Sequence, residues 1–205
     1  MKGIIPLKNE KTRKQRKVLL IRHFPTPLNE KDVSRGWSPT PMDSEYIDAA
    51  IELGEGLKLD GIIASDLQRT LQTALYVSIG SGAPILKTTT ILHTWNTGDL
   101  TGKPVEEVDP LLEKMAVEEP DKVLKGGESF NAFKYRFLIG LISILNEFPG
   151  KLLALATHGR NLALLRAWEE MNYNDELEVA SDNLGYEEFE PGTATLFTVE
   201  SGLLI

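Results

Sequence analysis

The sequence predicts an α/β fold built around a largely parallel sheet. Residues 17–22 and 152–157 form short, continuous apolar runs, which are typical of strands buried on both faces. Such runs alternate with longer stretches of helical spacing, as in βαβ units. The chain has no internal repeat and no long linker, so residues 17–205 are expected to form one domain after a basic leader at residues 1–16.

The elements of the first half follow from apolar spacing and capping residues. A loop rich in Pro, Asn and Gly follows the first strand, and Asp43 or Ser44 can cap the helix after it. A second strand is expected at 61–64 and a second helix at 65–79. Apolar side chains recur on one face of each helix: Ile47, Ala50, Ile51 and Leu57 in the first, and Leu67, Leu71, Ala74 and Leu75 in the second.

The second half of the chain continues the alternation of short apolar runs and helical patterns. Pro104 suits the start of a helix because its φ is fixed, and Pro149-Gly150 ends a long helix. The expected helices span 104–118, 129–148 and 160–171, and the expected strands span 85–86, 91–92, 152–157 and, at sheet edges, 185–189 and 193–199.

Composition limits the classes of function. The formal net charge of −8 argues against a general nucleic-acid or membrane-surface binder, because phosphates and anionic lipids would repel such a surface. The absence of cysteine excludes disulfides, thiol nucleophiles and thiolate metal sites. No apolar run reaches the ~18–20 residues that span a bilayer, and residues 1–7 do not resemble a secretory signal, so a cytoplasmic location is expected.

Cationic and imidazole side chains follow three of the expected strands. Arg22 and His23 come directly after the first strand, Arg69 lies one helical turn beyond the second, and His158 follows the strand at 152–157. In an open α/β sheet, ligands bind outside the carboxyl ends of the strands. These four side chains are therefore expected to converge on one site.

The residue types suit a phosphoryl group. Guanidinium forks match its oxygens bidentately, and a helix that begins near Gly159 would add backbone N–H donors. Nearby cations favour the neutral form of an imidazole, which can then attack phosphorus. Because arginines can supply the positive charge, we expect neither a metal nor a cofactor.

At this point the motifs resemble the histidine phosphatase superfamily. Residues 19–29 (LLIRHFPTPLN) are similar to its strand followed by R-H-G-x-T-x-x-N, and residues 65–74 (SDLQRTLQTA) are similar to its S-D-L-x-R-A-x-x-T-A. Gly-Glu-Ser at 127–129 and Thr-His-Gly at 157–159 also match, in the family's order. The resemblance implies a three-layer αβα sandwich with a mostly parallel central sheet, similar to phosphoglycerate mutase.

The resemblance also assigns roles to residues. It implies that His23 accepts the phosphoryl group, that Arg22, Arg69 and His158 are catalytic, and that Thr26 and Asn29 help to bind phosphate. His93 matches no histidine of the family and is expected to be structural or at the surface.

The sequence departs from the family pattern at two positions. Phe24 replaces a small residue after the histidine, and its ring is expected to narrow or cover the pocket. Thr94 occupies the position where many members carry a glutamate general acid, and a threonine hydroxyl is too weak an acid for that role. Asp99, in the loop between Gly98 and Gly102, is the candidate replacement; otherwise only good leaving groups would react well.

These features favour a metal-independent phosphatase that hydrolyses phosphomonoesters or phosphohistidine through a phosphohistidine intermediate. Its partner would be a small phosphorylated molecule or a phosphoprotein, with no membrane or nucleic-acid partner. Two alternatives remain: a binding protein of the same fold that has lost turnover, and a phosphotransferase similar to phosphoglycerate mutase. The chain lacks the long insertions with which such mutases enclose their substrate, so the phosphatase ranks first.

Overall fold

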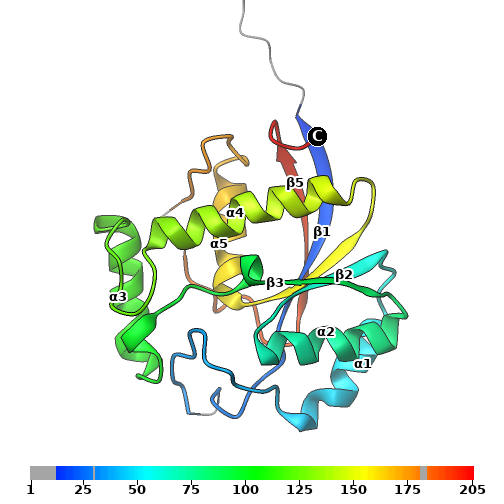
Figure 1. Cartoon of the computed structure of the whole chain (residues 1–205), viewed down its shortest axis with the longest axis horizontal. Coiled ribbons are helices and arrows are strands. Elements are labelled where there is room, and N and C mark those ends of the chain that lie inside the picture. The colour runs from blue at the N-terminus through cyan, green and yellow to red at the C-terminus, as the bar shows by residue number, and fades with distance from the viewer. Residues whose placement is uncertain (1–12, 30, 181–183) are drawn as a thin grey trace, which may run out of the picture.

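A computed structural model describes residues 13–29, 31–180 and 184–205 of the chain. Its centre is a five-stranded sheet of order β3-β2-β4-β1-β5, in which β1 to β4 are parallel and β5 is antiparallel to β1 (Figure 1). The α/β fold with a mostly parallel sheet is therefore confirmed. The strands are β1 (Lys14–Arg22), β2 (Gly61–Ser65), β3 (Ile85–Thr89), β4 (Leu153–Thr157) and β5 (Ala194–Ser201).

Helices cover both faces of the sheet, which confirms the three layers. Alternate residues of β1 point to opposite faces. Leu19 and Ile21 pack in a core with the α2 residues Ala74 and Val77, while Leu20 packs in a core with side chains of α3, α4 and α5. The helices are α1 (Ile47–Glu55), α2 (Gln68–Ser81), α3 (Val105–Glu118), α4 (Phe130–Glu147) and α5 (Gly159–Glu170).

The first strand begins three residues earlier than the sequence predicts. Residues 14–17 extend β1 beyond its pairing with β4 and pair with β5 alone, from Lys14 opposite Ser201 to Lys17 opposite Thr198. The antiparallel partner keeps these polar residues in the ladder, so residues 14–16 of the expected leader belong to the sheet. Residues 1–12 of that leader lie outside the described residues.

Two of the short strand predictions are wrong. Residues 90–92 form a 3-10 turn, because the Thr89 side chain accepts a hydrogen bond from the Ile91 N–H and caps it. Residues 185–189 form no strand; the carbonyl oxygens of Tyr186 and Phe189 accept hydrogen bonds from Arg22 instead of from a neighbouring strand. No helix within the described residues is long and apolar enough to cross a membrane.

Candidate active site

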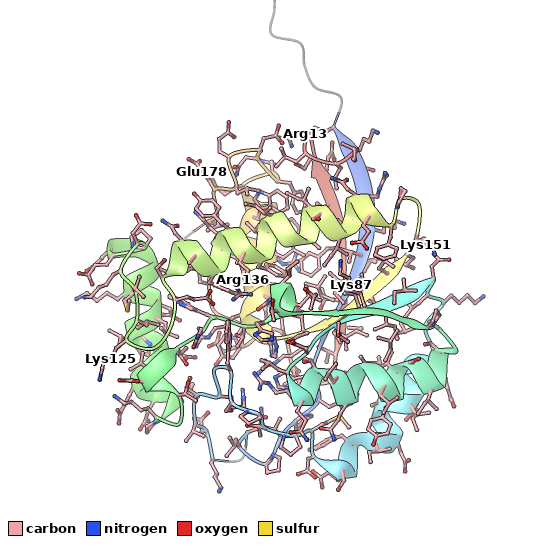
Figure 2. All side chains as sticks on the ribbon, in the orientation of Figure 1. Arg13, Lys87, Lys125, Arg136, Lys151 and Glu178 are labelled. Atoms are coloured by element: carbon pink, nitrogen blue, oxygen red, sulfur yellow. The ribbon has the colours of Figure 1, made fainter. Side chains whose placement is uncertain are left out.

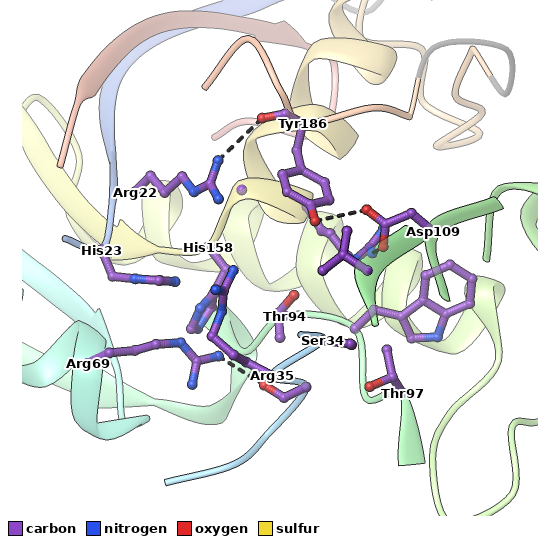
Figure 3. Close-up of a pocket in the computed structure, with 15 residues that line it drawn as sticks. Arg22, His23, Ser34, Arg35, Arg69, Thr94, Thr97, Asp109, His158 and Tyr186 are labelled. Atoms are coloured by element: carbon purple, nitrogen blue, oxygen red, sulfur yellow. Dashed lines mark hydrogen bonds and ion pairs between the residues drawn. The ribbon is translucent and has the colours of Figure 1, made fainter. Parts of the chain in front are cut away.

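The carboxyl ends of β1, β4 and β2 meet at one open cavity (Figure 3). Because β4 lies between β1 and β2, residues that follow these three strands come together at one edge of the sheet. Arg22, His23, Arg69 and His158 all line this cavity, as the sequence predicts. Side chains from three distant parts of the chain thus face a common space.

His23 is held in one tautomer. Its ring is buried, and Nδ1 lies 2.7 Å from the carbonyl oxygen of Phe24. Since a carbonyl only accepts, Nδ1 carries the hydrogen and Nε2 keeps its lone pair. Burial lowers the pKa of His23 well below 6.5, and the cations of Arg69 and Arg35 lower this pKa further. The ring is therefore neutral at neutral pH, with Nε2 free to act as a nucleophile.

His158 lies beside His23 in the same cavity. The two ring centroids are 5.3 Å apart, and His158 Nε2 lies 3.1 Å from the hydroxyl oxygen of Ser65 at the end of β2. Nδ1 of His158 is buried and has no hydrogen-bond partner among the described residues. Burial and the nearby Arg69 cation lower the pKa of His158 well below 6.5. The ring thus offers one uncommitted polar atom.

Arg22 and Arg69 are anchored through backbone carbonyls. Arg69 donates to the carbonyls of Gly36 (2.9 Å) and Ser38 (3.1 Å), and Arg22 donates to that of Phe189. In both arginines the buried Nε has no hydrogen-bond partner within the part of the chain that the structure describes. Burial, with repulsion from Arg35, lowers the pKa to about 10 for Arg22 and about 9 for Arg69, so both remain cationic at neutral pH. Fixed cations with unused donors suit a tetrahedral oxyanion.

A polar cluster forms the outer wall of the cavity. Asp109 of α3 forms an ion pair with Arg160 and accepts a hydrogen bond from the Tyr186 hydroxyl at 2.9 Å. The Arg22 and Arg160 guanidiniums lie 5.1 Å and 4.8 Å from the Tyr186 ring centroid. Sequence reasoning missed Asp109 and Tyr186 because no strand end or motif marks them, and it missed Arg160 although this residue directly follows the Thr-His-Gly motif.

The match to the model of the histidine phosphatase superfamily (branch 1) covers residues 18–200. The chain belongs to this superfamily. It is 26% identical to a Bacillus subtilis protein named "Uncharacterized phosphatase PhoE" over 69% of this chain and 71% of that one. It is 28% identical to a Salmonella choleraesuis protein named "Probable phosphoglycerate mutase GpmB" over 72% of each chain.

Other similarities to this superfamily are partial or structural. A Chlamydia caviae phosphoglycerate mutase is 39% identical, but the match spans only 27% of its length and 28% of this chain. The crystal structure of a Thermus thermophilus protein superposes with a TM-score of 0.65 at 25% identity, and covers 88% of this chain and 92% of that one. These comparisons include both phosphatases and mutases.

Asp99, the candidate replacement for the family's acid, does not face the cavity. Its carboxylate forms an ion pair with Lys125 at 2.9 Å, and its side chain is 60% exposed. Lys125 lies at the edge of the molecule (Figure 2). The backbone explains this placement, because the Asp99 N–H donates to the Lys125 carbonyl and so fixes the turn away from the cavity. The expectation that Asp99 reaches the pocket is wrong.

Thr26 and Asn29 match the family motif but do not line the cavity. The backbone N–H and the hydroxyl of Thr26 both donate to Asn29 Oδ1, at 2.9 Å and 2.8 Å. The acceptor atom of Asn29 thus stabilises the turn after His23. The structure therefore gives this pair a role in the geometry of the loop, and contact with phosphate stays a prediction.

Phe24 also does not narrow the cavity, contrary to the expectation from sequence. Its ring is buried in a small separate core with Met42 and Ala50. Gly192 makes room for it, since a Cβ there would lie 2.7 Å from two ring carbons. Phe24 is not among the residues that line the cavity, so its ring leaves the pocket open.

Thr94 lines the cavity, on a loop held by one partly buried ion pair. Arg136 of α4 pairs with Glu128 at 2.6 Å and donates to the carbonyls of Thr90, Ile91, His93 and Thr94. Figure 2 shows Arg136 on the side of α4 that faces this loop. His93 is buried and pairs with Asp66, and it does not line the cavity, which agrees with a structural role.

Proposed function

We propose that this chain is a phosphatase that transfers a phosphoryl group to His23 Nε2 and then to water. The observation that carries the proposal is the hydrogen bond from His23 Nδ1 to the Phe24 carbonyl, which leaves Nε2 unprotonated beside the guanidiniums of Arg22 and Arg69. The name of one relative, "Uncharacterized phosphatase PhoE", supports a hydrolytic activity.

The first step forms a bond between Nε2 and phosphorus and breaks the bond between phosphorus and the leaving-group oxygen. The leaving oxygen departs with the electron pair. The unused Nε donors of Arg22 and Arg69, together with His158, stabilise the charge on the three remaining oxygens. In the second step water attacks phosphorus, the bond to Nε2 breaks, and phosphate is released with His23 neutral again.

The proposed substrate is a small phosphorylated molecule or a phosphoprotein, and the proposed location is the cytoplasm. The buried side chains of Arg22, His23, Arg69 and His158 form a phosphoryl cradle, and the cavity above it is open, which supports both substrate classes. Within the described residues there is no group of three or more His, Asp or Glu side chains placed to hold a metal ion. The mechanism uses arginines for charge stabilisation and has no step that needs a metal or a cofactor.

The test is rapid quenching of the protein with a labelled aryl phosphate. The expected product is an acid-labile, base-stable phosphorylated protein that forms and decays at rates consistent with phosphate release. His23→Ala should form no adduct and lose turnover by about 10³-fold or more, because the nucleophile is absent. Turnover retained in His23→Ala would disprove the proposal.

A mutase is the second candidate, because relatives at similar identity are named as phosphoglycerate mutases. It predicts a different product. Incubation with 3-phosphoglycerate should then give 2-phosphoglycerate with little free phosphate, whereas a phosphatase gives inorganic phosphate and glycerate. Quantitative phosphorus NMR of one reaction mixture separates the two.

A further inference from the structure

Arg35 differs from the other three arginines that line the cavity. Arg22 and Arg69 are committed to backbone carbonyls, and Arg160 is committed to Asp109. The Arg35 guanidinium, in contrast, has no hydrogen bond or ion pair with any residue of the described ranges, although it is largely buried. Figure 3 shows it directed into the space between Arg22 and Arg69.

The backbone that carries Arg35 is fixed on both sides. The Ser34 N–H donates to the Lys103 carbonyl at 2.8 Å, and the Ser34 carbonyl accepts from the Gly102 N–H at 2.7 Å. On the other side, the Gly36 carbonyl accepts from Arg69. Gly36 has a φ of +44°, and a Cβ there would lie 2.4 Å from the Thr101 hydroxyl, so this position requires glycine. A rigid turn thus presents the guanidinium to the cavity.

Among the described residues that line the cavity, none is a carboxylic acid free to protonate a leaving group. The family's acid position holds Thr94, and Asp99 lies outside. Among the described residues, the one carboxylate that lines the cavity is Asp109. Both of its carboxylate oxygens are already engaged, Oδ1 by Arg160 and Oδ2 by the Tyr186 hydroxyl, so neither is available to a leaving group.

We propose that Arg35 donates a hydrogen bond to the leaving-group oxygen and stabilises its negative charge in place of a proton. This inference rests on the proposed phosphatase function. As His23 Nε2 bonds to phosphorus, the oxygen leaves with the electron pair, forms an ion pair with the guanidinium, and later takes a proton from water. The preferred substrates are then phosphomonoesters of acidic alcohols, such as phenols, and not those of simple alkyl alcohols.

A binding experiment tests the contact without turnover. Inorganic phosphate has an oxygen at all four corners, whereas methylphosphonate has a methyl group at one. Calorimetry is done with both ligands at a mildly alkaline pH, where both are dianions. Arg35→Gln should weaken phosphate binding by roughly fivefold or more and methylphosphonate binding by less than about twofold. Only phosphate places an oxygen at the leaving-group corner, which is the corner of the tetrahedron that the leaving-group oxygen occupies in a substrate.

The matched control is Lys31→Gln, which removes one cation from the same loop at an exposed position outside the cavity. It should change neither affinity by more than about twofold, and Arg35→Lys should recover part of the phosphate affinity. If Arg35→Gln weakens both ligands equally, Arg35 belongs to the phosphoryl cradle and the proposal is wrong. If it weakens neither, Arg35 does not touch the ligand, and the proposal is again wrong.

A kinetic experiment tests the chemical role. Aryl and alkyl phosphates that span a range of leaving-group pKa are assayed on wild type, Arg35→Gln and Lys31→Gln. Arg35→Gln should steepen the dependence on leaving-group pKa, with a loss of about 10²-fold for the poorest leaving group and much less for the best. A uniform loss across the series contradicts the proposal. If wild type itself releases no phosphate and forms no adduct, the phosphatase proposal fails, while the calorimetry still decides whether Arg35 occupies that corner.

Discussion

His23 combines two requirements that a single imidazole seldom meets: it must be neutral to attack, and it must lie where a dianion binds. Burial removes the water that would stabilise a protonated ring, and the cations of Arg69 and Arg35 oppose protonation directly. The same two cations attract a phosphate ester, Arg69 at its phosphoryl oxygens and Arg35, in our proposal, at its leaving-group oxygen. These cations therefore both keep His23 neutral and help to bind the phosphate ester that it attacks.

This argument predicts how the pKa of His23 responds to loss of each cation. Because both cations lower the pKa, removing either should raise it toward 6.5. Arg69→Gln should raise it more than Arg35→Gln, since Arg69 contributes the larger lowering, and Lys31→Gln should not move it. Burial still acts in each variant, so the pKa should stay below 6.5. The measurement is an NMR titration of the His23 ring carbon, assigned with His23→Ala.

The opposite order of the two variants, or a fall in the pKa, would contradict this electrostatic account. The direction of the shift in the His23 pKa also determines the pH range of activity. A lowered pKa means that the neutral imidazole persists as pH falls below 6.5, and the nucleophile is lost only below the shifted value.

At the scale of elements, the loop at residues 90–97 depends on α4. Four of its carbonyl oxygens accept hydrogen bonds from the single guanidinium of Arg136, whose charge is balanced by Glu128. Glu128 also accepts from the Asn96 N–H at 2.9 Å, so both ends of the ion pair bind the loop. The position of Thr94 in the cavity is therefore set from outside the sheet.

Removing one partner of this pair should leave a largely buried charge uncompensated. We expect Arg136→Met to lower the free energy of unfolding by about 2–4 kcal/mol. Glu128→Gln should cost less, because the amide oxygen can still accept hydrogen bonds. The double variant should cost less than the sum of the single ones, by about 1 kcal/mol or more. Urea denaturation of the four proteins measures this, and strictly additive losses would show that the pair is not coupled.

The sequence predicts those parts of the fold and site that depend on local pattern. The ends of the predicted strands placed Arg22, His23 and His158 in the site, because a buried apolar run and the residue after it can both be read from the sequence. Asp99 was misplaced because the direction of a turn depends on a distant carbonyl, that of Lys125. Arg35 was missed for a similar reason: its place in the cavity comes from pairing of its loop with residues 102–104, which local spacing does not reveal.

Across the whole molecule, charge is distributed unevenly. The chain carries a formal net charge of −8, yet four arginines line one cavity with a single carboxylate among the described lining residues. Exposed surface charges are screened over about 8–10 Å at moderate salt, while partly buried charges are screened much less. The binding of a small dianion should therefore depend on the charges that line the cavity and not on the net charge of the protein.

This contrast predicts that phosphate stabilises the folded protein specifically. A ligand that binds only the folded state adds about 2.7 kcal/mol at 100 times its Kd. For a chain of this size that corresponds to a rise in Tm of roughly 5–10 °C. Sodium chloride at the same ionic strength should raise Tm much less, and Arg22→Gln should lose most of the phosphate-dependent rise, because an unused donor and a cation are removed from the cradle. Differential scanning calorimetry measures both effects. Equal shifts with the two salts would mean that phosphate acts on the protein surface in general and not in the cavity.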